Sequence, residues 1–127
     1  MENSLKEILE SYLDTIPVPN IKTRNNAQGM VELIVPKYKR NWTKRIANFL
    51  GWPLYVYVEL DQLGTFAWRH FDGKSTVREI AIAMSNDGVE EAPFRLALFV
   101  RYLYQKGWIQ LLRPDKDNNS YEPPSTT

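Results

Sequence analysis

The chain lacks cysteine altogether and contains a single histidine, His70. The absence of cysteine excludes a disulfide framework, a thiolate nucleophile and any metal site built on cysteine. It agrees with a reducing compartment, and we expect the protein in the cytoplasm. Long apolar runs are missing as well, since no stretch approaches the roughly 20 residues of a membrane span and the N-terminus lacks a signal-peptide pattern. No contact with a membrane is therefore expected.

A large net charge and a recognisable catalytic cluster are also absent. The 127 residues carry a formal net charge of +1, so no overall field draws the chain to DNA or to an acidic membrane surface. His70 falls inside a predicted helix, where we expect a structural or surface role. No carboxylate pair or metal-ligand cluster shows a spacing suited to acid–base chemistry or metal binding. We expect neither enzymatic activity nor a bound metal or cofactor.

The segment FDGKST, residues 71–76, resembles the end of a phosphate-binding loop. The full motif needs a second glycine five residues before Gly73, where the sequence has Trp68, and a buried strand leading into it. The preceding residues show helical spacing instead. We predict a turn between two helices, in which Gly73 takes a positive φ. Thr76 then caps the next helix, and Glu79 completes a capping box.

The N-terminal segment is predicted to be an amphipathic helix over residues 3–14. Its apolar face is formed by Leu5, Ile8, Leu9, Tyr12 and Leu13. Pro17 and Pro19 prevent the helix from continuing. We expect this helix to pack on the domain's own core, and docking to a partner is the alternative. Residues 1–19 are assigned to this helix and a linker.

Residues 20–112 show the pattern of one small α+β domain. The predicted elements are a hairpin (20–25 and 29–35), a short helix within a basic insertion (37–53), a strand (54–60), three helices (62–71, 77–86 and about 90–106) and a short final strand (108–112). This order fits a winged-helix-like domain: a two- or three-stranded antiparallel sheet, three helices and the extra N-terminal helix. Residues 113–127 have no apolar period and are predicted to be a disordered tail.

Two elements carry more apolar surface than one small core explains. In strand 54–60 the aliphatic residues alternate with Tyr55 and Tyr57, and we expect the aliphatic set on the core and the tyrosines partly open. The last helix has one apolar stripe that a core accounts for and a second stripe about 100° around the helix. The second stripe comprises Phe94, Ala97, Leu98 and Tyr102, and it needs cover from the N-terminal helix or from a partner.

Two stretches, VELDQLGTFAWRHFDGKSTVREIAIAM and FRLALFVRYLYQKGWIQL, together resemble the PqqD family, the pyrroloquinoline quinone biosynthesis protein D and its relatives. The shared pattern is a strand ending in Leu60-Asp61, a helix with an aromatic before Asp-Gly, a T-V-x-E-I helix and a terminal helix closing on x-G-W-I. The resemblance covers about residues 54–112, and the hairpin matches in type only. The N-terminal stretch and the basic insertion look like those of a stand-alone subgroup rather than the quinone-pathway protein itself.

The resemblance implies a peptide-binding module without catalytic activity. Members of this family hold the leader segment of a ribosomally made precursor peptide by strand addition beside the last helix. They present the remainder to a modifying enzyme, often a radical S-adenosylmethionine enzyme. Such binding uses the unpaired N–H and C=O groups of an edge strand and a groove for alternate side chains.

The residues predicted to form the peptide-binding surface are Tyr55, Tyr57, Phe94, Leu98, Arg101 and Tyr102. Arg101 and the nearby Arg95 are expected to select an acidic residue of the leader. The hypothesis requires that the chain's own N-terminal segment leave the strand edge and the slot beside it open. Pairing of the open edge with a second copy, giving a homodimer, is an alternative.

A basic cluster in the insertion has several interpretations. It comprises Lys37, Lys39, Arg40, Trp42, Lys44 and Arg45. Such clusters bind nucleic acid or anionic membrane surfaces. We favour a solvated loop whose aromatic side chains fold back on the core, with steering of an acidic leader or docking of the modifying enzyme as alternatives.

The runner-up function is a DNA-binding winged helix or another non-catalytic accessory protein. A helix that enters the major groove presents outward Arg, Lys, Asn or Gln side chains. The last helix has Arg95, Arg101, Gln105 and Lys106, but aliphatic residues interrupt them. Because the net charge is also close to zero, nucleic acid is not the expected partner.

Overall fold

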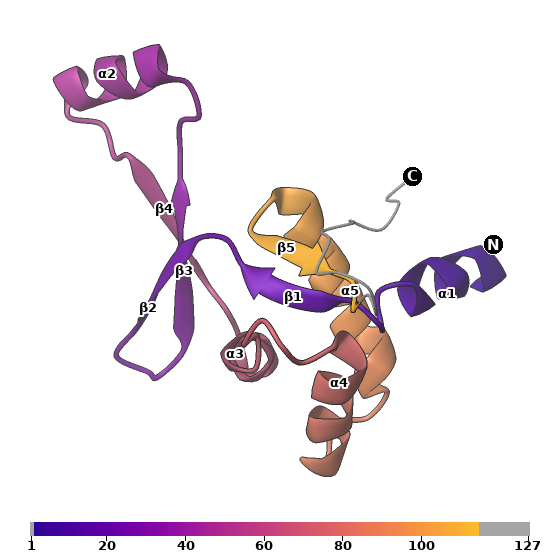
Figure 1. Ribbon diagram of the computed structural model, residues 1–127. Coiled ribbons are helices and arrows are strands. Elements are labelled where there is room, and N and C mark those ends of the chain that lie inside the picture. Colours follow the sequence, from indigo (N-terminus) through magenta and orange to yellow (C-terminus); the bar gives the residue numbers. More distant parts are fainter. Residues whose placement is uncertain (1, 115–127) are drawn as a thin grey trace. The chain divides into compact units, whose positions relative to one another are not determined.

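The computed structural model describes residues 2–114, with side chains from Ser4 onward. The fold is α+β, as the sequence predicts, and the chain forms two compact units (Figure 1). The first unit contains the residues up to Asn20 together with those from Phe66 onward, and the second contains Ile21–Thr65. This division differs from the predicted one, because the N-terminal segment belongs with the C-terminal helices. The predicted tail lies outside the described residues from Asp115 on.

The first unit packs the last helix against elements from both ends of the chain. α5 (Ala92–Lys106) contacts α1 (Glu2–Glu10), α4 (Val77–Asn86) and β5 (Ile109–Leu112), and β1 (Ile16–Pro19) pairs with β5 in an antiparallel sheet. The core includes Leu9, Tyr12, Val77, Ile80, Met84, Leu96, Val100, Leu103, Ile109 and Leu111. Burial of Leu9 and Tyr12 confirms that the N-terminal helical segment packs on the domain's own core.

The N-terminal helix ends earlier than predicted, and hydrogen bonds fix the segment after it. α1 stops at Glu10 rather than near residue 14. At the start of α4, the N–H of Val77 donates to the carbonyl of Thr15 (2.9 Å). The N–H of Arg78 donates to the carbonyl of Leu13 (2.8 Å). The first N–H groups of a helix have no intrahelical acceptor, so these bonds satisfy them and tie the N-terminal segment to α4.

β1 is a strand that the sequence analysis did not predict, because it contains Pro17 and Pro19. Asn20 N donates to Trp108 O (2.9 Å), in a pair that extends the β1–β5 register. In an antiparallel ladder, residues whose backbone groups face the partner alternate with residues whose groups face away. Val18 and Asn20 therefore face β5. Both prolines face away from β5, where a missing N–H removes no ladder bond.

α3 (Gln62–Arg69) and α4 are joined by the predicted turn, although α3 ends two residues before its predicted end. Gly73 has a φ of 76°. Thr76 Oγ1 accepts a hydrogen bond from Glu79 N (3.2 Å), and the Glu79 carboxylate accepts one from Thr76 N (2.8 Å). The predicted turn and capping box are both confirmed.

The turn also explains why this segment does not resemble a phosphate site in three dimensions. The Asp72 carboxylate accepts hydrogen bonds from the N–H groups of Ser75 (2.8 Å) and Lys74 (2.9 Å). These bonds hold the pKa of Asp72 below its ordinary value. Phosphate loops use free backbone N–H groups to bind their anion. Here the turn's own carboxylate occupies these donors.

The second unit is a three-stranded antiparallel ribbon with a helix inserted between its last two strands. β2 (Lys22–Asn25), β3 (Val31–Pro36) and β4 (Tyr55–Glu59) pair in the order β2-β3-β4, which confirms the predicted hairpin and the strand that follows. α2 (Asn41–Leu50) joins β3 to β4 and ends at Gly51, whose φ is 75°. Figure 1 shows α2 lying across the end of the ribbon formed by β3 and β4.

The prediction that the aliphatic side of β4 faces the core is correct at one end of the strand only. Leu60 is buried, as are Val31 and Leu33 on the neighbouring strand. Val58 is half-buried, and Val56 is exposed. Leu54, the member nearest α2, is half-buried again, so the cover of the aliphatic side is weakest at Val56. Alternation in a sequence shows which side of a strand is apolar but not how far along the strand the cover extends.

Candidate functional site

β4 has one free edge, and the hydrogen-bond register identifies the residues that form it. At one end of the β3–β4 ladder Lys37 N donates to Leu54 O (2.8 Å). At the other end Leu60 N donates to Val31 O (2.8 Å). Both bonds fit the observed register, so the even-numbered residues of β4 face β3. The residues that direct their N–H and C=O groups away from β3 are Tyr55, Tyr57 and Glu59.

The other sheet edges of the described residues are less suited to accept a strand. β1 presents its two prolines outward, so that edge lacks two N–H donors. The outward residues of β5, Ile109 and Leu111, are buried. β2 consists of four exposed polar residues, KTRN, two of them charged, and charged side chains on an edge strand disfavour pairing. No strand among residues 2–114 pairs with the outer edge of β4.

The tyrosine side of β4 is ordered by side chains from the neighbouring strands. Tyr55 and Tyr57 are each 49% exposed. The guanidinium of Arg24 lies over the Tyr57 ring, 3.9 Å from its centroid. Arg24 Nε also donates to the Glu32 carboxylate (2.7 Å), and this bond, with a second from Asn26, holds the pKa of Glu32 below its ordinary value. An exposed cation–π contact contributes about 0.5–1 kcal/mol, so Tyr57 has a preferred orientation.

Three side chains of the predicted second stripe are exposed along α5. Phe94 is 44%, Leu98 39% and Tyr102 50% exposed, and each follows the last by four residues, so they line one face. Trp108 meets the Tyr102 ring edge-on, with centroids 5.9 Å apart and an interplanar angle of 83°. The Lys106 ammonium lies 5.5 Å from the centre of the same ring. The stripe therefore ends in an aromatic side chain that its neighbours hold in place.

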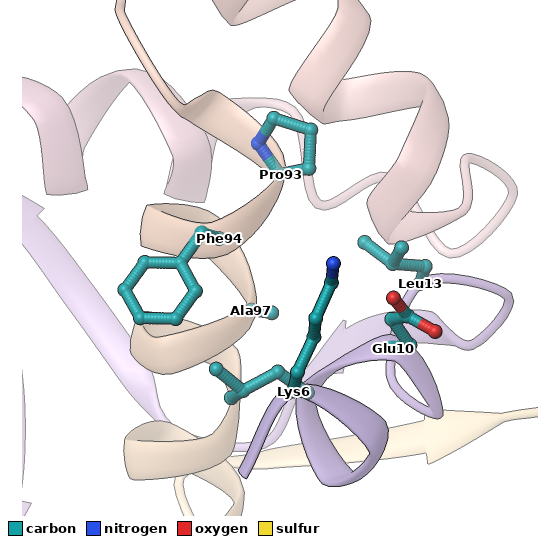
Figure 2. Close-up of a pocket in the computed structure, with 7 residues that line it drawn as sticks. Lys6, Glu10, Leu13, Pro93, Phe94 and Ala97 are labelled. Atoms are coloured by element: carbon teal, nitrogen blue, oxygen red, sulfur yellow. The ribbon is translucent and has the colours of Figure 1, made fainter. Parts of the chain in front are cut away.

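α1 covers the remaining member of that stripe. Ala97 is buried, and it lines a depression of about 150 Å³ between α1, the residues after it and the start of α5. The other lining residues are Lys6, Leu9, Glu10, Leu13, Pro93 and Phe94. Figure 2 shows the Lys6 side chain extending through the middle of this depression, between the α5 side and the side formed by Glu10 and Leu13.

Arg101 lies close to the N-terminal segment rather than standing free on α5. Its side chain is half-buried, and its Nε atom and the hydroxyl of Tyr12 are buried without a hydrogen-bond partner among the described residues. Burial raises the pKa of Tyr12, and the Arg101 cation opposes this rise. The two side chains therefore lie close to each other. Arg95, by contrast, is exposed.

The predicted peptide-binding residues are divided between the two units. Tyr55 and Tyr57 belong to the second unit, and the four residues of α5 belong to the first. Within the second unit both tyrosines lie on the free edge, and within the first unit three of the four residues lie on one exposed stripe. The N-terminal strand β1 pairs with β5 and leaves the outer edge of β4 unpaired. The strand pairing is thus compatible with the required free edge, and the slot beside it stays a prediction.

The basic cluster lies on and around α2, and the aromatic side chains there do not fold back. Trp42 is 59% exposed and Phe49 is 88% exposed, and Ala47 is the buried residue of this helix. The predicted fold-back of the cluster's aromatic side chains is therefore wrong for Trp42, whereas Tyr38, the other aromatic residue of the cluster, is half-buried. Thr43 and Ala47, one turn apart, form the side of α2 with the least exposure, and the large apolar residues occupy the side next to it.

Four exposed apolar residues beside the basic cluster were not among the predicted site residues. They are Ile46, Phe49, Leu50 and Trp52. Helical spacing in the sequence indicates that the first three share a face with Trp42. The spacing does not reveal whether the face is covered, and the sequence predicts only a short helix here.

His70 packs at the end of α3. Its Nδ1 lies 2.8 Å from the carbonyl oxygen of Phe66, and its ring stacks on the Phe66 ring with centroids 4.4 Å apart. Among residues 2–114, no group of three or more histidine or acidic side chains is placed to hold a metal ion. In the same part of the chain, every helix is too short or too polar to cross a membrane.

The fold and these surfaces define a small α+β protein whose described residues include an unpaired β4 edge without proline and an exposed apolar stripe on α5. Comparisons with models of known protein families, with curated proteins and with solved structures give no match. The likeness to PqqD proteins is thus an expectation based on the motifs quoted above. The function has to be argued from the site itself.

Proposed function

We propose that this protein binds an extended peptide by strand addition to the free edge of β4 and has no catalytic role. The observation that carries the proposal is the outward-facing set of backbone groups at Tyr55, Tyr57 and Glu59. This edge carries no proline, is not buried, and has a single charged residue, Glu59, at its end. A peptide strand beside β4 satisfies these N–H and C=O groups in the way that strands pair within a sheet.

The resemblance to PqqD proteins supports a more specific form of the proposal. The bound peptide is the leader segment of a ribosomally made precursor, and the protein presents the remainder to a modifying enzyme. In this view the partner enzyme is of the radical S-adenosylmethionine type, as it often is for members of that family. The lysine and arginine residues of the basic cluster are a weaker proposal for docking it.

Backbone pairing alone is expected to bind a peptide weakly. Three outward residues offer up to about six main-chain hydrogen bonds, each with a net contribution of roughly 1 kcal/mol. Ordering a flexible peptide costs about 2–5 kcal/mol. Apolar anchors must add the rest, at about 1.5–3 kcal/mol for each side chain that becomes buried. The resemblance adds the α5 stripe of the first unit as a separate proposed anchor surface: Phe94, Leu98 and Tyr102, with Arg95 and Arg101 favouring an acidic residue.

The decisive experiment distinguishes the contribution of the β4 backbone to peptide binding from that of its side chains. A displayed library of short random peptides, selected on the full chain, supplies the probe, and fluorescence anisotropy gives its Kd. Tyr57→Pro removes an outward N–H and leaves the β3–β4 ladder intact, whereas Tyr57→Ala removes only the ring. We expect Tyr57→Pro to bind about tenfold more weakly than Tyr57→Ala, which corresponds to one or two lost hydrogen bonds.

The matched control is a proline on the other edge of the same ribbon. The bond from Asn26 N to Met30 O (2.9 Å), together with the β2–β3 register, places the N–H of Thr23 on the outer edge of β2. Thr23→Pro should leave the Kd unchanged. The proposal fails if no library peptide binds, or if Thr23→Pro weakens binding as much as Tyr57→Pro does.

The contribution of α5 is tested by its own substitution. Leu98→Glu places a charge within the exposed stripe, and we expect binding to weaken by at least about tenfold while circular dichroism shows an intact fold. Full affinity of this variant, together with a loss in Tyr57→Pro, would remove α5 from the site and leave strand addition in place. Binding should also change little with salt, whereas contacts to nucleic-acid phosphates weaken steeply.

A further inference from the structure

α2 presents an apolar face that its own unit leaves exposed. At about 100° per residue, Trp42, Ile46, Phe49 and Leu50 fall on one side of the helix. All four are exposed, and the fraction reaches 88% for Phe49. Trp52, just beyond the end of the helix, is exposed as well. A monomeric soluble protein rarely leaves a cluster of large apolar side chains in water without a binding role.

The charges around this face are all of one sign. Residues 37–54 contain five basic side chains, Lys37, Lys39, Arg40, Lys44 and Arg45, and no aspartate or glutamate. On α2 itself Lys44 lies opposite the apolar face, and Arg45 lies at its border. The small net charge of the whole chain conceals this local concentration. An amphipathic helix with lysine and arginine on its polar side and tryptophan, phenylalanine and leucine on the other side suits the surface of an anionic membrane.

We propose that α2 and its flanking residues form a peripheral membrane-contact surface that binds bilayers containing anionic lipids. The apolar face enters the boundary between headgroups and acyl chains, and the five cations contact the lipid phosphates. Within the second unit α2 lies across the end of the β3–β4 ribbon (Figure 1), and its large apolar side chains are exposed there. An exposed apolar helix face bordered by cations fits a soft planar anionic surface, whereas an acidic protein partner would need a cleft of matching shape.

This inference departs from the sequence-based expectation of no membrane contact. That expectation depended on the absence of an apolar run of spanning length and on the low net charge, and neither feature excludes a helix that lies in the interface. It also goes beyond peptide binding. The apolar face of α2 and the free edge of β4 involve different residues, so either proposal can fail without the other.

Flotation of the full chain with lipid vesicles tests the proposal. We expect binding to vesicles of phosphatidylcholine with phosphatidylglycerol, much weaker binding to phosphatidylcholine alone, and weakening as ionic strength rises. Phe49→Asp should reduce the partition coefficient at least about tenfold, because the charge prevents insertion. Ile82→Asp is the matched control, since Ile82 is also a large apolar residue, 56% exposed, and belongs to α4 of the other unit.

The electrostatic part has its own pair of variants. Lys44→Gln should reduce binding about fivefold, the effect expected for one cation near an anionic surface. Lys74→Gln, in the turn before α4, should have no effect. Brominated lipids should quench tryptophan fluorescence, and the quenching should disappear when Trp42 and Trp52 are both replaced by phenylalanine.

Several outcomes would overturn the proposal. The chain fails to float with anionic vesicles, or Ile82→Asp reduces flotation as much as Phe49→Asp. If the chain does not bind vesicles but self-associates in sedimentation equilibrium, and Phe49→Asp abolishes the self-association, the face binds a second copy. Binding of fluorescent polyglutamate that depends on Phe49, again without vesicle binding, would assign the face to an acidic polypeptide.

Discussion

Proline substitutions along β4 should show which backbone groups face β3 and which face outward. The N–H of Val56 lies in the ladder opposite Val35, and the N–H of Tyr57 points away from it. Proline removes the N–H at either position. Each proline variant is compared with alanine at the same position, so that the difference in the free energy of unfolding reports the backbone and not the lost side chain.

The expected difference is large at one position and small at the next. Val56→Pro loses a ladder hydrogen bond, about 1 kcal/mol, and leaves the half-buried carbonyl of Val35 without a donor, which costs roughly 1–2 kcal/mol more. Val56→Pro should therefore be about 2–3 kcal/mol less stable than Val56→Ala. Tyr57→Pro should differ from Tyr57→Ala by less than about 1 kcal/mol, because the residue before a proline prefers the extended backbone that a strand already has.

Urea denaturation followed by circular dichroism measures all four variants. Hydrogen exchange in the unsubstituted chain gives a second measurement, in which the amide of Val56 should exchange more slowly than that of Tyr57. Equal proline–alanine differences at the two positions, or a larger one at Tyr57, would refute the register from which the free edge was derived. The strand-addition proposal would fail with it.

The remaining predictions concern the stability of each unit and are all measured by urea or pH titration. Thr76→Ala should lower the free energy of unfolding by about 1 kcal/mol, because the N-cap of α4 is lost. Leu103→Ala, in the core of the first unit, should lower it by about 2–5 kcal/mol. The Arg24 hydrogen bond lowers the folded-state pKa of Glu32. The contribution of this bond to the free energy of unfolding is therefore complete above the ordinary carboxyl pKa, near 4.3, and is lost as the pH falls through the lowered pKa. Glu32→Gln should make the free energy of unfolding fall less steeply at acid pH, and an unchanged pH dependence would contradict the assigned role of Glu32. Tyr12→Phe should leave stability equal or up to about 1 kcal/mol higher, because the buried hydroxyl has no hydrogen bond. The raised pKa of Tyr12 predicts that the unsubstituted chain loses stability above about pH 10 and that Tyr12→Phe does not. If Tyr12→Phe were clearly less stable at neutral pH, Arg101 would have to bond to the hydroxyl.

Features governed by local chemistry could be predicted from the sequence. The capping box of Thr76 and Glu79 and the positive φ of Gly73 depend on residues within one turn of chain, and both are found as expected. The side chain of Asp61 accepts a hydrogen bond from Gly64 N (2.7 Å) and so caps α3, a role that an aspartate directly before a helical stretch commonly has. The alternating strand 54–60 and the helices after it follow from periodicity alone.

Features that depend on distant partners could not be predicted. Pro17 and Pro19 argue against a strand until the register with β5 shows that both face outward. Arg101 was expected to contact an acidic residue of the leader, but the N-terminal segment brings Tyr12 beside it. The apolar face of α2 has the pattern of a core helix, and only the structure shows that its own unit leaves it uncovered. Each case depends on which segments contact each other, and the periodicity of a single segment does not predict such contacts.

The unpaired edge of β4 differs from the other sheet edges of the described residues, and this difference bears on its function. An unpaired edge invites aggregation, and proteins block such edges with proline, charge, burial or cover. This chain does so on β1, β5 and β2, yet on β4 it places Tyr55 and Tyr57 outward without a proline or a basic residue between them. If that edge only paired with a second copy, peptide affinity would fall as protein concentration rises and Tyr57→Pro would yield a monomer. A chain that is already monomeric, and whose peptide affinity is independent of its concentration, leaves a foreign strand as the occupant that explains the open edge.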